Sequence, residues 1–594
     1  MACSRPRWRL ERWAGNVSPM PGFRTEWDTA PNPTYDVWTV TNGGEVVPGI
    51  LSPFMASSFN RQDEKSIRSL IAAYPTGRYV KVYKAPIGNF FGVFAGRLAL
   101  NAGFTAAAMS LLDPGIAEAM LQQFFTGTEG TQRFIVRVPD EARAAAVAVA
   151  AEQRADATAL LDARRDHLYA ERRSAQFSLD RHLGLKSAWK RHEQLTLDNT
   201  EALKLHYVVS TAAGEFQVRL MGLLMTGGLD PAAAIGLCSG LGDVESAKPA
   251  MGLWDVAQVA KRHPLVEAAL RAEHADSLLA TMAASKERGW VAFAKSFAAF
   301  LHDYGYRVQG EADPSNPDWT EQPEFALSQV RAMLDVVAGD SPQAQAKRSA
   351  ANRKVLERTI RTALAVELRA PFDAVLGEAQ RFTRMREYSK AMWILGTRRQ
   401  RATYLAICDG LVAMGRLADP DDTRFLLYGE VKTLVAAKPV PGQAAKIRRR
   451  RVQFAKADDY VLPDVWAGDV AAKKRPKVRA GVTAMQGLGV SVGEGPVEGP
   501  ARIVANVQAA FEREIKDGDI LIAPFTDAPW TPLFIPAGAV VVETGGVLSH
   551  AATVAREFAI PCVVMVKDAT RIIHDGDTVR VDGATGSVTI VARH

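Results

Sequence analysis

Apolar residues recur at helical spacing over most of the chain. Between about residue 100 and residue 435, alanine, leucine, arginine and glutamate dominate, and these residues favour helices. Loops rich in glycine and proline separate the periodic stretches, most clearly at 305–323. The pattern predicts a largely α-helical region. The helices predicted from it are 140–174, 198–226, 325–337, 344–368 and 381–414.

The apolar runs become shorter from residue 481 onward. Runs of four or five consecutive apolar residues bounded by turns are typical of buried strands, and they occur at 520–523, 539–542 and 562–566. Residues 576–591 alternate between apolar and polar positions around a glycine-containing turn, which predicts two paired strands. This end of the chain is therefore predicted to be a compact α/β domain.

These two patterns divide a chain of 594 residues, which is too long for one hydrophobic core. Pro439, Pro441 and Gly442 end the helical pattern, and basic runs follow before the α/β pattern begins. We therefore expect a multidomain protein with a hinge between its two main parts. The predicted parts are an N-terminal extension (1–34), a mainly helical domain (35–435), a basic linker or hinge (436–480) and the α/β domain (481–594).

Positive charge is concentrated near the predicted hinge. The formal net charge is +7, and the densest basic runs are 446–451 and 473–477. A basic chain can bind nucleic acid, an anionic small substrate or an acidic partner. Aromatic residues do not interleave these runs and no nucleic-acid module accompanies them. A solvated helix face followed by a basic linker is the favoured interpretation, and nucleic acid is not expected as a partner.

Cysteine usage and hydropathy indicate the compartment. Four cysteines are scattered far apart, which excludes a CxxC metal knuckle and disfavours a disulfide framework. No window approaches the ~18 uninterrupted apolar residues of a membrane span. Residues 1–22 lack the apolar core of a signal peptide. We expect a cytoplasmic protein with no membrane contact and no metal site.

The segment 544–562 carries the clearest chemistry. An apolar strand leads into Gly545 and Gly546, which allow a tight turn and a close approach to a ligand. Ser549 is a good N-cap for a helix over 551–558, so His550 falls in the first helical turn. A phosphoryl group there would meet free backbone N–H groups and the positive end of the helix dipole. Because imidazole is a competent nucleophile near neutral pH, His550 is a candidate phosphoryl carrier.

The whole run from Thr544 reads T-G-G-x-L-S-H-x-A-x-x-A-R-E-x-x-I-P, and it resembles the phosphohistidine motif of the PEP-utilising enzyme family. The flanking D-G-D-I-L (517–521), T-P-L (531–533) and D-G-x-x-G (582–586) also fit that family. The resemblance implies a swivelling mobile domain whose His550 is transiently phosphorylated. It further implies that Thr544 and Ser549 orient or cap the histidine. Independently of the resemblance, Arg556 can supply charge to a phosphate or pair with Glu557 or another acid.

Sparser matches upstream resemble the rifampin phosphotransferase branch of this family. They lie at 38–54, 304–323, 386–390 and 414–422. Arg386 and Lys390 are four residues apart and share a helix face. The resemblance implies that this cationic pair faces the incoming phosphohistidine, where it would stabilise a phosphoryl group in transfer. An ordinary exposed charged face is the alternative.

Other upstream positions are weaker candidates. The resemblance suggests substrate-handling roles for Glu45, Arg307 and Glu311, although ion-paired structural loops give the same pattern. Tyr306 stands where the family usually has a histidine, so handling of the acceptor is expected to differ if that histidine matters. Apolar helix residues are candidates to line a pocket for a hydrophobic or aromatic alcohol, with ordinary core packing as the alternative. These residues are Met221, Met225, Met392 and Trp393.

The source of the phosphoryl group is not evident in the sequence. Family members carry an ATP-grasp domain that phosphorylates the histidine, and nothing in these residues matches it or the PEP-binding barrel. There is also no GxxxxGK[ST] loop. We expect a split phosphotransferase, similar to phenylphosphate synthase, in which a separate ATP-grasp subunit uses ATP and Mg²⁺. PEP is the alternative donor.

Three functions therefore compete. The first is a phosphotransferase subunit that passes the phosphoryl group from His550 to the hydroxyl of a small acceptor. The second is a phosphohistidine carrier or regulator that yields no small-molecule product. The third is a binding protein that has lost phosphotransfer, which the intact motif around His550 disfavours.

Overall fold

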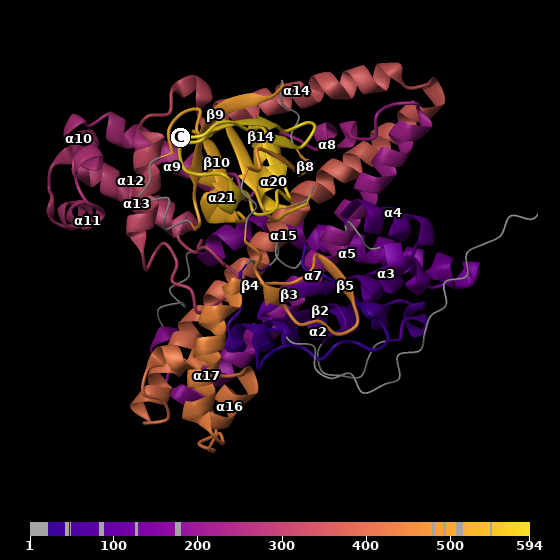
Figure 1. Ribbon diagram of the computed structural model, residues 1–594. Coiled ribbons are helices and arrows are strands. Elements are labelled where there is room, and N and C mark those ends of the chain that lie inside the picture. The colour runs from indigo at the N-terminus through magenta and orange to yellow at the C-terminus, as the bar shows by residue number, and fades with distance from the viewer. Residues whose placement is uncertain are drawn as a thin grey trace, which may run out of the picture.

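The computed structural model is a helical body with an α/β domain seated on it (Figure 1). The structure describes residues 22–41, 47, 49–81, 88–124, 129–172, 180–477, 481–490, 495–506, 515–546 and 549–594.

Two long helices form the spine of the body, α7 (Leu185–Thr226) and α15 (Val366–Ala413). They run antiparallel, because His192 near the start of α7 contacts Thr403 of α15, while Phe216 near its end stacks on Phe382. Between these points Asn199 donates to Thr397 at 3.3 Å. The pair therefore holds residues nearly 200 positions apart in the sequence in fixed register.

The remaining helices either pack around this spine or, over residues 248–333, pack against one another and the C-terminal domain. Five helices predicted from periodicity are present, although 198–226 and 381–414 are only the later parts of α7 and α15, and the predicted 344–368 crosses the break between α14 and α15. The remaining helices of the body are α2 (Pro53–Ala73), α3 (Ala102–Ser110), α4 (Pro114–Phe124), α5 (Asp140–Arg172), α8 (Ala233–Leu237), α9 (Lys248–Lys261), α10 (Pro264–Ala272), α11 (Ala275–Ala284), α12 (Arg288–Tyr304), α13 (Pro323–Met333), α14 (Pro342–Ala363), α16 (Tyr428–Val435) and α17 (Gln443–Lys456).

The predicted hinge is largely folded onto the helical body. Its strand β5 (Val465–Ala467) pairs antiparallel with β1 (Val37–Thr39), in a sheet ordered β2-β3-β1-β5 with β2 (Phe91–Phe94) and β3 (Arg97–Asn101). A second small sheet pairs β4 (Tyr460–Val461) with β6 (Lys473–Lys474). The C-terminal sheet begins at β7 (Ala484–Gln486). Most of the predicted linker 436–480 therefore belongs to the helical body, and a hinge is expected only after β6.

The basic run 446–451 lies in α17, as the helical interpretation predicts, but it is only partly a solvated face. Arg450 is buried and donates to Glu430 and Glu26. Arg451 donates to Asp421 and Asp422 at 2.8 and 2.9 Å. These acidic partners are at least 20 residues away in the sequence. The local composition of the run therefore does not reveal that its positive charges are paired.

The C-terminal domain is built on an eight-stranded sheet, ordered β7-β14-β13-β9-β10-β11-β12-β8. The four neighbours β9, β10, β11 and β12 run parallel, and the outer pairings are antiparallel. The strands predicted from short apolar runs are confirmed. Their bounds are β8 (Leu488–Gly489), β9 (Val497–Ile503), β10 (Ile520–Ala523), β11 (Ala539–Val542), β12 (Cys562–Val564), β13 (Thr578–Asp582) and β14 (Ser587–Ala592), with short helices α19 (Thr531–Phe534), α20 (His550–Phe558) and α21 (Ala569–Ile572).

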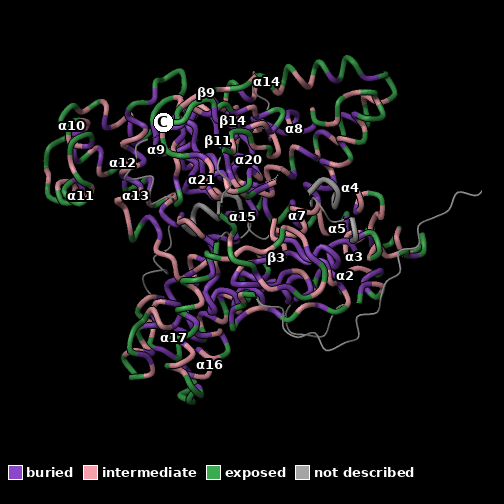
Figure 2. Tube along the Cα trace, in the orientation of Figure 1, coloured by how far each residue is buried: buried purple, intermediate pink, exposed green. Residues whose placement is uncertain are grey.

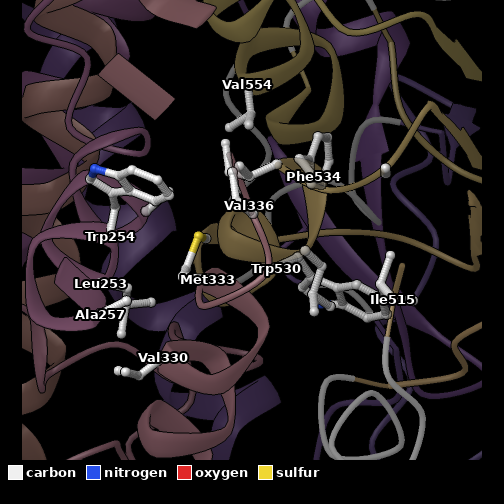
Figure 3. Packing of buried hydrophobic residues seen from close by; sticks show 14 of the residues in the cluster. Leu253, Trp254, Ala257, Val330, Met333, Val336, Ile515, Trp530, Phe534 and Val554 are labelled. Atoms are coloured by element: carbon white, nitrogen blue, oxygen red, sulfur yellow. The ribbon is translucent and has the colours of Figure 1, made fainter. Parts of the chain in front are cut away.

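The two parts share one apolar cluster. Figure 3 shows Met333 and Val336 of the helical body close to Trp530 and Phe534 of the C-terminal domain. Buried residues run without a gap from the helices around α9 into the sheet domain (Figure 2). The C-terminal domain is therefore docked on the helical body, and this docking sets the geometry of the site.

Candidate active site

The glycine-rich turn after β11 positions the first turn of α20. Gly545 has φ +133°, and a Cβ there would lie 3.0 Å from Oγ of Ser549, so glycine is required. Ser549 caps the helix as predicted, since its Oγ accepts a hydrogen bond from the Ala552 N–H at 3.3 Å. Gly546 accepts from the Ser549 N–H at 3.0 Å. Thr544 anchors the turn by donating its hydroxyl to the carbonyl of Pro524 at 3.0 Å.

His550 begins α20, and a threonine hydroxyl lies at each of its ring nitrogens. Thr526 Oγ1 is 3.0 Å from Nδ1, and Thr531 Oγ1 is 3.0 Å from Nε2. Thr531 also donates its hydroxyl to the carbonyl of Ser246 at 2.8 Å. Because a hydroxyl has one proton, Thr531 accepts from Nε2–H. This network assigns the proton of the neutral ring to Nε2 and the lone pair to Nδ1, where the Thr526 hydroxyl donates.

The ring of His550 is held in its neutral, nucleophilic form. Burial lowers the pKa of His550 well below its usual value, and the positive charges of Lys390 and Arg307 lower it further. Both cations belong to the helical body. Docking therefore brings together the sequence-predicted histidine and two of the sequence-predicted cationic residues.

A buried charged cluster lies across the domain interface beside His550. Arg307 donates to Glu311 at 2.9 Å, and Lys390 lies 3.9 Å from the other oxygen of Glu311. From the C-terminal domain, Asp527 accepts from the Gly310 N–H at 2.7 Å. Burial raises the pKa of Asp527 to about 7; Glu311 raises it further, while Lys390 and Arg307 oppose the shift.

Arg386 lies one turn before Lys390 on α15. It donates to Glu387 at 2.7 Å, and Glu387 in turn accepts from Ser246 at 2.7 Å. Its positive charge also acts on His206 of α7, as does that of Lys390. The predicted cationic pair is therefore present on one face of α15, and its first member is already engaged by an acid.

Arg556 faces the helical body from the far end of α20. Burial lowers its pKa to about 10, with Cys238 and Arg386 among the groups that act on it. Its carbonyl accepts from Ser349 at 2.6 Å. The neighbouring Glu557 accepts from the N–H groups of Leu241 and Gly242 at 3.1 and 3.0 Å. This end of α20 lies in the docking interface, so a role for Arg556 in charge balance at the interface is a proposal.

The other candidates are dispersed. Glu45 lies outside the described residues. Met392 and Trp393 are buried in the core around α2 and α7, Met221 packs against a different cluster, and Met225 is 65% exposed. These four side chains do not line a common pocket, because they lie in two different apolar clusters and on the surface.

Thr526, Asp527 and His206 were not identified as site residues from the sequence, and Thr531 was noted only within the T-P-L match. Thr526 and Asp527 follow the carboxyl end of the parallel strand β10, where ligands bind in open α/β sheets, so that position was the available signal. His206 lies within an amphipathic helix and gave no local signal.

The cavity beside His550 is very small. Its volume is about 10 Å³, and it is lined by Phe525, Thr526, Thr544, Gly545, Ser549, His550 and Ala551. A cavity of this size holds at most one water molecule. In the described parts of the chain no group of three or more His, Cys, Asp or Glu side chains forms a metal-binding cluster. None of the helices among the described residues is both long and apolar enough to cross a membrane.

Comparison with known proteins identifies the class of the C-terminal domain. Residues 515–586 match the family described as PEP-utilising enzyme, mobile domain. The α/β domain that carries His550 is therefore a mobile domain of this class.

The helical body is similar to part of a particular enzyme of that class. Residues 206–387 match the family described as rifampicin phosphotransferase fourth domain. A rifampicin phosphotransferase of Streptomyces sp is 33% identical over 361 residues, which are 59% of this chain and 40% of the relative. That of Bacillus subtilis is 27% identical over 355 residues, 57% of this chain and 39% of the relative. The chain spans about two fifths of the length of these relatives.

Proposed function

We propose that this chain carries a phosphoryl group on His550 and transfers it to the hydroxyl of a small, hydrophobic or aromatic acceptor. The supporting observation is the neutral imidazole at the start of α20, flanked by Thr526 and Thr531 and facing cations of the helical body. An unprotonated ring nitrogen attacks phosphorus, and the first N–H groups of α20 stabilise the oxygens of the resulting phosphohistidine.

The helical body is the proposed site of transfer to the acceptor. Lys390, Arg386 and Arg307 would stabilise the negative charge of the phosphoryl oxygens during transfer. Glu311 holds Arg307 and lies near Lys390, so it keeps the two cations in position. Glu45 is a weaker candidate for contact with the acceptor.

The phosphoryl group is proposed to come from outside these 594 residues. A separate ATP-grasp subunit using ATP and Mg²⁺ is the favoured donor, because these residues contain no GxxxxGK[ST] phosphate-binding loop and no match to an ATP-grasp domain. We expect transfer in both directions to need movement of the mobile domain, because the described cavity beside His550 is small in the docked position. The proposed hinge lies on the C-terminal side of β6, where the strands paired on the helical body end.

Phosphate labelling tests this function. The protein would be incubated with a candidate ATP-grasp partner, Mg²⁺ and ATP labelled at the β or γ phosphate, and acid-labile label would be measured. We expect label on the wild type and on His574→Ala, a histidine elsewhere in the same domain, and none on His550→Ala. Label on His550→Ala at the wild-type level would refute the assignment.

Two further results separate the alternatives. Label that enters His550 but never appears on any hydroxyl compound would favour a phosphohistidine carrier. Label from PEP but not from ATP would replace the donor while leaving the role of His550 intact.

A further inference from the structure

A second imidazole lies beside the cationic pair, on the helical body. His206 of α7 packs against α15, where its ring stacks on Trp393 with centroids 6.4 Å apart and planes 14° apart. Its Nδ1 is 3.0 Å from Oγ of Ser389. Ser389 immediately precedes Lys390, so His206 is attached to the same turn of α15 that presents the cation to His550.

The hydrogen bonds of Ser389 fix the tautomer of His206. Ser389 is fully buried (0% exposed), and its hydroxyl donates its only proton to the carbonyl of Arg386 at 3.0 Å. The oxygen that lies 3.0 Å from Nδ1 of His206 must therefore accept the Nδ1 proton. Because neutral imidazole has one N–H, Nε2 carries the lone pair. The hydroxyl of Ser210 lies 3.3 Å from Nε2 and 3.5 Å from Nδ1.

His206 is also kept uncharged. Burial lowers its pKa well below the usual value, and Arg386 and Lys390 lower it further. Part of the residue's surface stays exposed. Lys390, the residue after Ser389, acts electrostatically on both imidazoles, so His206 and His550 share one neighbouring cation.

We propose that His206 Nε2 is the base that accepts the proton of the acceptor hydroxyl during phosphotransfer. The inference rests on the proposed function of His550. In the step, the acceptor oxygen forms a P–O bond while the P–N bond to His550 breaks. The electron pair of that bond returns to the His550 nitrogen. The hydroxyl proton passes to Nε2 of His206 and is then released to solvent.

In enzymes that use a nucleophile and a base, a third side chain often orients the base by a hydrogen bond, and Ser389 is placed to do this for His206. A hydrogen bond to one ring nitrogen fixes which nitrogen is the acceptor. Ser389 is therefore a positioning residue, and its removal is expected to weaken the base without abolishing it.

The test separates charging of His550 from its discharge. The chain would be phosphorylated chemically with phosphoramidate, so that no partner is required, and label on His550 would be followed after dilution into water alone or into rifampicin. We expect His206→Gln to be labelled to the wild-type extent but to lose label on the order of 10²-fold more slowly, since a general base contributes at least that factor. Ser389→Ala is expected to slow discharge about tenfold.

His192→Gln is the matched control. His192 lies on the same helix, is buried, and bonds through Nδ1 to Thr403 at 2.9 Å, but it is remote from the cationic pair. Its discharge rate is expected to equal that of the wild type. Wild-type discharge of both His206→Gln and Ser389→Ala would overturn the role of His206. Absence of label on the wild type would instead overturn the proposed function of His550, and the inference with it.

Discussion

The hydroxyl of Thr531 has one proton and two neighbours. It donates to the Ser246 carbonyl of the helical body and accepts from Nε2–H of His550. The residue is fully buried (0% exposed), so neither neighbour has water as a ready substitute. The orientation of the reactive ring therefore depends on a hydroxyl at this position.

Replacing that hydroxyl is expected to misalign the ring. Thr531→Val leaves Nε2–H without its partner, and an unsatisfied buried donor costs ~1–3 kcal/mol, so the rate of labelling by phosphoramidate should fall by about tenfold or more. Thr531→Ser retains the hydroxyl and should label within about twofold of the wild type. Equal rates for the valine and serine variants would contradict the assigned hydrogen bond.

At this scale the sequence predicts local contacts better than distant ones. Ser549 capping α20 and His550 in its first turn depend on residues within three positions of each other, and both were predicted. Thr526 and Thr531 reach His550 across 24 and 19 positions, through the packing of α20 beside the turn that follows β10. Their roles follow from the parallel sheet rather than from local spacing.

At the scale of secondary-structure elements, the two spine helices α7 and α15 approach each other closely. A Cβ at Gly396 of α15 would lie 2.1 Å from Oδ1 of Asn199 on α7, so the two helices touch where this glycine lies. The contact lies between the two imidazoles of α7, His192 and His206. It therefore contributes to the position of His206 relative to Lys390.

A methyl group at this contact should separate the helices. Gly396→Ala is expected to lower the free energy of unfolding by about 2 kcal/mol, because added volume in a packed site forces the backbone apart. Denaturant unfolding would measure the change. Gly377→Ala is the matched control on the same helix. A Cβ there meets nothing within 4 Å, so the higher helix propensity of alanine should raise stability by up to about 1 kcal/mol. Similar changes in the two variants would refute the close contact.

The sequence predicts that these helices exist, but it does not predict where they end. The predicted helix 344–368 continues across Leu364, where α14 ends, because no glycine or proline marks the break. Leu364 is instead held by an apolar cluster that also contains Leu224 and Phe372. Conversely, Pro371 and Gly377 suggest a loop, yet α15 continues through both, because the surrounding apolar residues pack on α7 and α14.

The two parts of the molecule are docked, and two buried acids oppose that docking when ionised. Burial raises the pKa of Asp527 to about 7 and also raises that of Glu557. Both residues lie in the mobile domain and bond to backbone N–H groups of the helical body. This arrangement could not be predicted from the sequence, because the shared apolar cluster mixes residues 244–336 with residues 490–564.

Docking is therefore expected to weaken as pH rises. For an acid whose pKa is raised in the docked state, the favourable contribution is complete below the ordinary aspartate pKa of 3.8 and is lost as pH rises through about 7. Small-angle scattering should show a larger radius of gyration at pH about 8 than at pH about 5. Asp527→Asn should reduce this pH dependence, whereas Asp517→Asn, an exposed acid of the same domain, should not. A compact Asp527→Asn protein that expands as the wild type does would contradict the role of Asp527.

The shared hydroxyl of Thr531 links domain position to the location of a single proton. While the mobile domain is docked, the Ser246 carbonyl takes the threonine proton, so Nε2 of His550 must keep its own. Once the domain departs, that carbonyl is no longer present, and the threonine is free to turn its proton toward the ring and leave Nε2 with the lone pair. Movement of the mobile domain, some hundred residues long, would thus change which ring nitrogen of His550 carries the lone pair. Nδ1 would be the nucleophile in the docked position, and Nε2 could be the nucleophile once the domain has moved away.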